Sequence, residues 1–239
     1  MVSDQIYRAF YPDEGRSGTR FFYSLIKGHV TQSMVALDLG AGPGPVDDVR
    51  KLRGLVGRLI AVDIDKDVLG NPDVDEAHVI SASAALPFES STVDVIVSDY
   101  VFEHVENPSY FLREAGRVLK PGGRLYFRTP NLLHYVAMFS YLTPQVVHEL
   151  LANRMRGLPT GSHDPYPTFY RMNRPATLRS LGCEAGFGVC EISMIEAEPS
   201  YMRFNTVPFL MGVGYERLVN AHPMFGTFRA NIIGFLGKD

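Results

Sequence analysis

Short apolar runs alternate with amphipathic stretches along most of this chain. Residues 108–119 place an apolar residue every three or four positions behind an Asn-Pro pair, which predicts a helix. A second helix is predicted from about Asn173 to Gly186. This alternation indicates one α/β domain over residues 1–239. Strands are predicted at about 35–39, 58–63, 77–81, 93–99, 123–129, 187–195 and 228–236.

The run from Val35 to Gly44 changes from apolar residues to alternating glycines. Such a break is typical of a strand that delivers its carboxyl end to a ligand, because the turn and the close approach both favour residues without a side chain. Pro43 and Pro45 stiffen the turn, and Pro45 suits the first position of a following helix. A dinucleotide site is the competing interpretation, but its third glycine would have to stand at Pro45.

The second predicted strand ends in two acids, Asp63 and Asp65. A carboxylate at this position can accept both hydroxyl groups of a ribose, so Asp63 is the candidate ribose ligand. Ile64 beside it offers an apolar surface to an adenine ring. Asp65 stands immediately before residues 66–69 and is interpreted as the cap of a short helix.

Six segments of the chain resemble, in order and spacing, the successive motifs of class I S-adenosylmethionine-dependent methyltransferases. The resemblance is strong over about residues 30–130 and looser beyond them. It implies a Rossmann-like, doubly wound sheet of seven strands, six parallel and one antiparallel, with helices on both faces. It also implies that S-adenosylmethionine lies across the carboxyl ends of the first four strands. The segments are Leu37–Gly44, Ala61–Asp65, Leu86–Phe88, Val93–Asp99, Phe102–Val105 and Arg117–Gly123.

The same resemblance implies roles for individual residues at the cofactor. Asp38 would fix the amino group of the methionine part and Asp63 the ribose. Asp99 and Tyr100 would face the methionine end and the methyl group. The family commonly has an acid for the adenine a few residues before Leu-Pro-Phe; this chain has serines and alanines there, so Ser83 or a backbone amide would substitute. The turn under the methionine part comprises Gly40, Ala41, Gly42 and Gly44.

Composition and charge narrow the functional classes. The net charge of −3 argues against a general nucleic-acid binder, which would present a basic surface. No apolar run approaches the roughly 20 residues of a membrane span, and the first residues lack the features of a signal peptide, so a cytoplasmic protein is expected. Cys183 and Cys190 are interpreted as buried apolar residues, and no residues show metal-ligand spacing. The oligomeric state cannot be inferred from these features.

Residues 130–172 and 197–224 are too long for ordinary connections in an α/β domain. By the resemblance they lie above the cofactor and are expected to shape the acceptor pocket. Residues 1–33 are predicted to be a helical segment that either closes over the cofactor or packs against the domain. A short helix is predicted to open at Thr143-Pro144. The apolar stretch Val207–Val213 suits a pocket wall, a dimer contact or a shallow membrane contact, in that order.

A hydroxyl acceptor must lose its proton, and a histidine with a pKa near neutrality is the natural base. His163 is the first candidate because Asp164 and a tyrosine-rich loop adjoin it. His134, just after the fifth predicted strand, and His104 follow. His163 is alternatively interpreted as a residue of an exposed loop, and His104 as one that holds the turn after the fourth strand. Residues 150–180 hold five arginines and one acid, which favours an anionic acceptor. Candidate acceptor-binding residues in this insert are Tyr166, Tyr170 and Arg171.

These features favour a methyltransferase that acts on a hydroxyl of a sugar or another small, anionic metabolite. Thr129–Asn131 and Tyr170–Arg174 resemble methyltransferases of polysaccharide and natural-product pathways. Ser98–Val101 lacks the Asn/Asp-Pro-Pro-Tyr/Phe element of enzymes that methylate amino groups of bases, which counts against nucleic-acid methylation. A carboxylate, phenol or amine acceptor stays open, as does a protein that binds S-adenosylmethionine without transferring the methyl group. A hydride-transferring oxidoreductase is disfavoured by Pro45.

Overall fold

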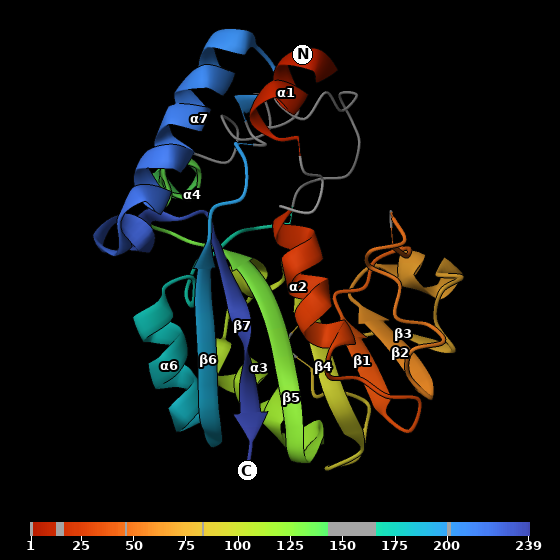
Figure 1. Ribbon diagram of the computed structural model, residues 1–239. Helices are drawn as coiled ribbons and strands as arrows, with labels where there is room; N and C mark the ends of the chain where they lie inside the picture. Colours follow the sequence, from red (N-terminus) through yellow and green to blue (C-terminus); the bar gives the residue numbers. More distant parts are fainter. Residues whose placement is uncertain (1, 13–16, 46, 83, 143–165, 200–201) are drawn as a thin grey trace.

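A computed structural model of the protein shows one seven-stranded sheet in the order β3-β2-β1-β4-β5-β7-β6 (Figure 1). The structure describes residues 2–12, 17–45, 47–82, 84–142, 166–199 and 202–239. Strand β7 pairs antiparallel with both β5 and β6, and the other neighbouring strands pair in parallel. The predicted sheet of six parallel strands and one antiparallel strand is confirmed. The strands are β1 (Val35–Leu39), β2 (Arg58–Asp63), β3 (Glu76–Val79), β4 (Val93–Asp99), β5 (Leu119–Pro130), β6 (Phe187–Ile195) and β7 (Asn231–Lys238).

Helices cover both faces of the sheet and one of its ends. Helix α2 (Gly18–Lys27) lies on the face turned toward the viewer in Figure 1, and α3 (Pro108–Val118) and α6 (Pro175–Glu184) lie behind it. Helices α1 (Asp4–Phe10), α4 (Tyr135–Leu142) and α7 (Thr206–Ala221) gather beyond the carboxyl ends of β5 and β6.

Alternate residues of the strands face the two helical layers, and this alternation makes two cores. Leu37 of β1 and Phe127 of β5 belong to the core under α3 and α6. Ala36 and Tyr126, one position earlier on the same strands, pack with Phe22 and other residues of α2. Because both faces are covered, the central strands read as nearly continuous apolar runs, which is why the sequence predicts them well.

Helices α1, α4 and α7 together form a cap over this end of the sheet. Two of them, α4 and α7, were not predicted from the sequence. Helix α7 was missed because Pro208 and two glycines weaken its helical pattern. Pro208 lies in the first turn, where a missing N–H is tolerated, and a Cβ on Gly212 would lie 2.5 Å from Pro199 Cβ, so that helix position has no room for a side chain. The helix predicted at Thr143-Pro144 lies outside the described residues.

Two further predictions were wrong. Residues 47–57 form turns and no helix follows Pro45 in that described stretch, because the chain crosses to β2 by a short connection. Cys183 is exposed and Cys190 is half-buried. On α6 the neighbouring Gly182 packs against Leu236 of the sheet, which turns Cys183 away from the core.

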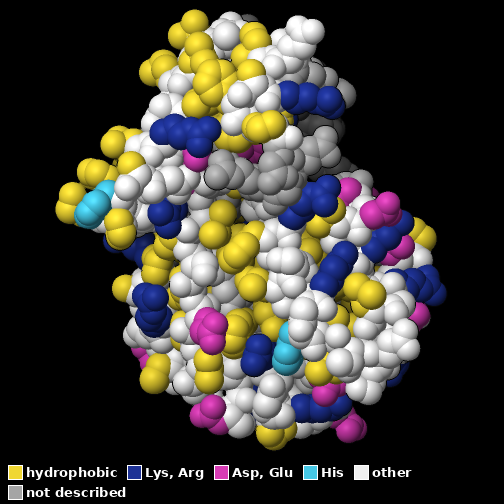
Figure 2. All heavy atoms as spheres, in the orientation of Figure 1, with side chains coloured by type: hydrophobic (Ala, Val, Ile, Leu, Met, Phe, Trp, Pro, Cys, Tyr) yellow, Lys and Arg dark blue, Asp and Glu magenta, His cyan; other side chains and the backbone are white. Residues whose placement is uncertain are grey.

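Hydrophobic side chains gather on the surface of the cap, around α1 and α7 (Figure 2). One face of α7 packs Phe209 and Val213 against α1. The opposite face leaves four apolar side chains exposed: Val207, Leu210, Met211 and Leu218. No helix in the described part of the chain combines the length and apolar character needed to cross a bilayer.

Candidate functional site

The glycine turn after β1 has one crowded side and one open side. Gly40 has φ +82°, and a Cβ there would lie 2.3 Å from Val101 Cγ2. Gly42 has φ +56°, but a Cβ there would meet nothing within 4 Å. Gly40 is therefore required by packing and backbone geometry together. Gly42 leaves space above the turn in which a ligand can approach the backbone closely.

Asp63 at the end of β2 ties two loops together. Its Oδ2 accepts a hydrogen bond from the Gly42 N–H at 2.8 Å, and its Oδ1 accepts one from the Asp65 N–H at 2.9 Å. The adjacent Ile64 leaves 43% of its surface exposed. Asp65 accepts from the Asp67 N–H and caps the short helix at residues 66–70, so its predicted capping role is confirmed.

Three carboxylates end three neighbouring strands of the sheet: Asp63 on β2, Asp38 on β1 and Asp99 on β4. Burial, with smaller contributions from the charges on Asp99 and Asp63, raises the pKa of Asp38 to about 7. Among the described residues Asp38 has no hydrogen-bond partner for its side chain. A positively charged ligand placed beside Asp38 would stabilise its ionised form.

Asp99 is bound by a cation that the sequence analysis missed. Arg128 of β5 donates two hydrogen bonds of 2.6 Å to the Asp99 carboxylate, and Tyr23 of α2 donates a third at 3.3 Å. Arg128 also donates to Thr19 Oγ1 and lies 4.5 Å from the centre of the Tyr100 ring. The signal in the sequence was an arginine within the otherwise apolar end of a central strand.

Tyr100 follows Asp99 directly and turns toward β7. Its φ is +59°, and its hydroxyl donates a hydrogen bond of 2.6 Å to Asn231 Oδ1. The predicted cofactor residues on β1, β2 and β4 thus share one edge of the sheet. Ser83, the predicted adenine contact, lies outside the described residues.

The arrangement at this edge fits S-adenosylmethionine. That cofactor carries a sulfonium and an ammonium group, and the edge presents the carboxylates of Asp38 and Asp63, while the charge of Asp99 is balanced by Arg128. The open side of Gly42 leaves room for a ligand against the backbone, and Ile64 offers an exposed apolar side chain next to Asp63. The donor set therefore suits a cationic nucleoside with an apolar base.

Part of the predicted acceptor set lies close to this edge. The Tyr166 hydroxyl donates to Asp65 Oδ2 at 3.1 Å, and its ring centre lies 6.0 Å from that of His104. His104 Nδ1 lies 3.0 Å from the Pro167 carbonyl oxygen. His104 thus has a structural contact as well as a place next to Tyr166. His163, the first candidate base, lies outside the described residues.

Tyr170 and Arg171 are held by the turn after β4. Tyr170 has φ +52° and its N–H donates to the Glu103 carbonyl oxygen at 3.2 Å. The Arg171 guanidinium donates to the Glu106 carbonyl oxygen and lies over the Phe169 ring. The contact with Glu106 uses one of the five N–H donors of Arg171.

Glu103 is a buried acid that the sequence analysis did not single out, although it stands beside His104. Its Oε2 accepts a hydrogen bond of 3.0 Å from Thr129, whose hydroxyl accepts one of 2.7 Å from Asn173. Burial raises the pKa of Glu103 to about 7. Through its own carbonyl oxygen and this chain of contacts, Glu103 anchors the segment from Phe169 to Asn173.

His134 lies under the cap. Burial lowers the pKa of His134 to about 4, so the ring is neutral near pH 7. The Val136 N–H points at Nδ1, which places the ring proton on Nε2, 3.5 Å from Glu196 Oε2. The Tyr215 ring also packs against it. The described contacts of His134 are to α4, β6 and α7, and none is to Asp38, Asp63 or Asp99.

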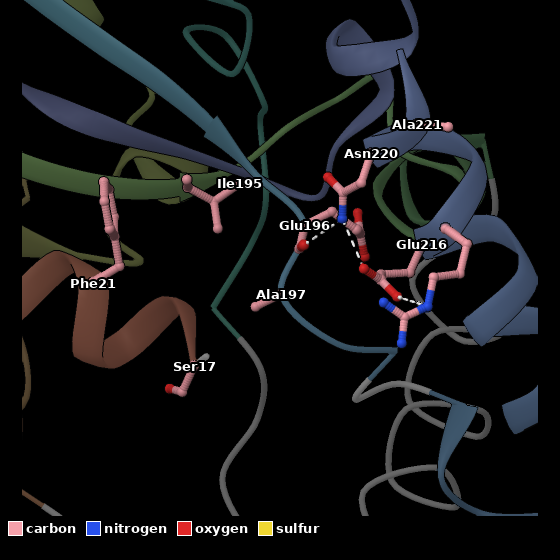
Figure 3. A pocket seen from close by; sticks show the side chains of 9 residues that line it. Ser17, Phe21, Ile195, Glu196, Ala197, Glu216, Asn220 and Ala221 are labelled. Carbon is pink, nitrogen blue, oxygen red and sulfur yellow. Dashed lines mark hydrogen bonds and ion pairs between the residues drawn. The ribbon is translucent and has the colours of Figure 1, made fainter. Parts of the chain in front are cut away.

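A pocket of about 470 Å³ lies between α2, the end of β6, and α7. Figure 3 shows Glu196, Glu216 and Asn220 turned toward one another on one side, with Phe21 of α2 on the other. Asn220 donates to Glu216 Oε1 at 2.8 Å and to the Glu196 carbonyl oxygen at 3.0 Å. This cluster was not predicted, because the sequence of α7 was interpreted as an apolar stretch.

Comparisons with known proteins agree with this geometry. The family described as "Methyltransferase domain" matches residues 37–127, which run from β1 through β5. A ubiquinone biosynthesis O-methyltransferase of Burkholderia orbicola is 29% identical over 177 residues, covering 71% of each chain. The enzyme with the same name from Burkholderia multivorans is 28% identical over the same length and coverage.

Solved structures share the fold. The complex of the Haloferax volcanii Trm112 methyltransferase activator with a methyltransferase contains a chain with a TM-score of 0.59 and 22% identity, covering all of both chains. A methyltransferase of Aquifex aeolicus that depends on S-adenosylmethionine has a TM-score of 0.51 and 16% identity, covering 98% of this chain and 99% of its own. The fold and the order of the motifs are consistent with the class I S-adenosylmethionine-dependent methyltransferases, and residues 37–127 match a methyltransferase domain.

Proposed function

We propose that this methyltransferase transfers the methyl group to a hydroxyl oxygen of a small molecule. The observation that carries the proposal is the edge at which Asp38 and Asp63 lie beside the Asp99–Arg128 pair. The two carboxylates match a cationic methyl donor, and the side toward β5 and β7 is left for the acceptor. The choice of oxygen is supported by the O-methyltransferases named above, which align with 71% of the chain.

Each residue of the edge has a proposed task. Asp63 receives the ribose hydroxyls while its bonds to the Gly42 and Asp65 N–H groups keep both loops in place. Asp38 faces the ammonium group, and Ile64 lies against the adenine. Asp99 acts by holding Arg128, Tyr23 and thus α2 beside the methionine end.

When bound, S-adenosylmethionine supplies an electrophilic methyl group that passes to the acceptor oxygen as the C–S bond breaks and the hydroxyl proton leaves. The protein's main contribution is to align the acceptor with that bond, which can lower a barrier by about 7–11 kcal/mol. We propose His163 as first candidate for the proton acceptor and His104 as second. His104 lies beside Tyr166 at the cofactor edge, whereas His134 is enclosed by the cap.

The sequence favoured a sugar or an anionic metabolite as acceptor, with Tyr166, Tyr170 and Arg171 as its ligands. Tyr166 contacts Asp65 after β2, at the nucleoside end of the proposed cofactor edge and not on the side toward β5 and β7, so its case as an acceptor ligand is weaker. Arg171 contacts the backbone at Glu106, so the case for an anionic acceptor is weaker than the count of arginines suggested.

The decisive experiment has two stages. First, S-adenosylmethionine and its demethylated product are titrated into the protein by calorimetry, with NAD as the competing cofactor. Then candidate alcohols, phenols, carboxylates and amines are incubated with the protein and S-adenosylmethionine, and formation of S-adenosylhomocysteine is measured. Turnover with alcohols or phenols is expected. Turnover with amines or carboxylates alone would overturn the choice of oxygen.

A further inference from the structure

The pocket between α2, β6 and α7 contains a hydrogen-bond acceptor that has no partner among the described residues. The Glu196 side chain is 3% exposed and lines the pocket. Its Oε2 accepts a hydrogen bond of 2.7 Å from the Ala230 N–H, and His134 Nε2 approaches the same oxygen. Oε1 has no hydrogen-bond partner among the described residues. A carboxylate buried to this degree normally has partners for both oxygens, so Oε1 is left for a ligand.

The other polar side chains of the pocket already have hydrogen-bond or ion-pair partners within the protein. Glu216 accepts from Asn220 and from the Tyr11 hydroxyl, and Arg217 Nε lies 3.4 Å from Glu216 Oε2. Arg217, the cation among the described lining residues, is therefore engaged with Glu216. Burial raises the pKa of Glu196 to about 7, so above that pH the pocket carries net negative charge and an anionic ligand would be repelled from it.

The opposite wall is apolar. Phe21 of α2 leaves 37% of its surface exposed and lies on this side with Ile195, while Ala197 and Ala221 line the pocket next to Glu196 and Asn220 (Figure 3). A volume of about 470 Å³ lies in the range of small-molecule sites. A flat apolar body would pack against Phe21 while its polar end reaches Glu196.

The pocket adjoins the cofactor edge through two consecutive residues of the chain. Ala230 binds Glu196, and the next residue, Asn231, accepts the hydrogen bond of Tyr100 at the end of β4. A Cβ on Gly18 would lie 3.8 Å from Asn231 Nδ2, so the start of α2 closes the same side.

We propose that this pocket is the acceptor site and that it takes an uncharged or cationic aromatic alcohol, whose hydroxyl or ammonium group donates a hydrogen bond to Glu196 Oε1. This inference rests on the proposed function and narrows its substrate class. It replaces the anionic acceptor that the arginine count favoured, because none of the described arginines of residues 150–180 lines this pocket and Arg217, which does, is paired with Glu216.

The test uses three probes that share a catechol ring and differ in charge: 4-methylcatechol, dopamine and 3,4-dihydroxybenzoate. Their binding to the full chain is measured by calorimetry in the presence of saturating S-adenosylhomocysteine. We expect the neutral and cationic probes to bind at least tenfold more tightly than the carboxylate. Glu196→Gln should reduce that preference to less than threefold. Glu191→Gln, which removes the same charge from an exposed position on β6, should leave it unchanged.

A second variant tests the pocket without changing its charge. Ala221→Leu places extra volume at the wall, at an exposed position near the end of α7, so folding should be retained. This variant should bind all three probes at least tenfold more weakly than the parent, while its affinity for S-adenosylhomocysteine stays unchanged. Equal binding of the anionic probe, or no binding of any probe, would overturn the assignment of the pocket. If the parent protein does not bind S-adenosylhomocysteine, the proposed cofactor edge is contradicted instead.

Discussion

Arg128 and Asp99 are register partners on β5 and β4, and their side chains form a pair with two hydrogen bonds of 2.6 Å. The Arg128 side chain is 3% exposed and that of Asp99 13%. Tyr23 and Thr19 add two contacts from α2, so the pair joins two strands to the helix that covers them.

Replacing Arg128 by methionine should therefore destabilise the protein by about 3–5 kcal/mol, because it leaves a largely buried carboxylate without its cation. Urea unfolding followed by circular dichroism measures the loss. Arg124→Met is the matched control on the same strand, since Arg124 lies over the Phe235 ring and makes no ion pair with Asp99. Equal losses for the two variants would mean that the pair with Asp99 has no special weight.

Affinity for S-adenosylmethionine should depend on pH through Asp38. Because its pKa is raised to about 7, the carboxyl becomes protonated as the pH falls from 8 to 6. A cationic ligand binds the ionised form, so affinity should fall over that interval, by up to about tenfold for each pH unit below the pKa. Asp38→Asn should remove this dependence. Calorimetry on both proteins isolates Asp38, because titration of the ligand is common to them, and parallel curves would contradict its place at the ammonium group.

Asp63→Ala should weaken S-adenosylmethionine binding by about 1.5–3 kcal/mol, the scale of hydrogen bonds to a charged group. Asp63→Asn, which keeps one carbonyl acceptor, should lose less. Asp67→Ala is the control, because Asp67 is exposed four residues away on the same loop. If the alanine variant at Asp63 binds the cofactor as tightly as the parent in calorimetry, the ribose assignment is wrong.

The two sides of the glycine turn should respond differently to substitution. Gly42→Val should abolish cofactor binding with a loss of stability of about 1–2 kcal/mol, because the side chain enters open space from a left-handed backbone. Gly40→Ala should lower the melting temperature more, since its Cβ would lie 2.3 Å from Val101 Cγ2. Thermal unfolding and calorimetry together measure both effects. Retained binding in Gly42→Val would show that the open side does not receive the cofactor.

Stability should fall as pH rises through the titration of Glu103. Its folded pKa of about 7 lies above the ordinary value of 4.5, so the folded state holds a proton that the unfolded chain releases between these values. At pH 8 its ionisation should cost up to about 3 kcal/mol. Glu103→Gln should therefore gain stability relative to the parent between pH 5 and pH 8, as measured by urea unfolding. Glu89→Gln, a control at an exposed position, should show no such gain. If the difference in unfolding free energy between Glu103→Gln and the parent does not change with pH, Glu103 does not titrate in this range.

The sequence predicted the parts of the fold that depend on local pattern. The strands of the sheet lie within a few residues of their predicted positions because buried parallel strands are continuous apolar runs. Asp63 at the end of β2 was predicted because it directly follows such a run, whereas the roles of Asp38 and Asp99 came from the resemblance to the methyltransferase motifs. The helix N-cap at Asp65 involves only the next two residues, so it could also be predicted from the sequence.

What escaped prediction depends on pairs far apart in the chain. Asp99 and Arg128 meet only because β4 and β5 pair in one register, and a shift of one residue would separate them. Glu196 and Glu216 meet only because α7 folds back over the end of β6. Neither relationship leaves a periodic trace in the sequence, so both the salt bridge and the pocket required the structure.

The position of β7 between β5 and β6 has a consequence for synthesis on the ribosome. Both neighbours are made before β7, and each leaves a row of backbone amide and carbonyl groups that only β7 pairs. The nascent chain must therefore carry two open strand edges until the final strand emerges, and such edges invite pairing with other chains. The half of the sheet that holds β1 to β4 has no such dependence, so the cofactor edge can assemble while its acceptor side is still incomplete.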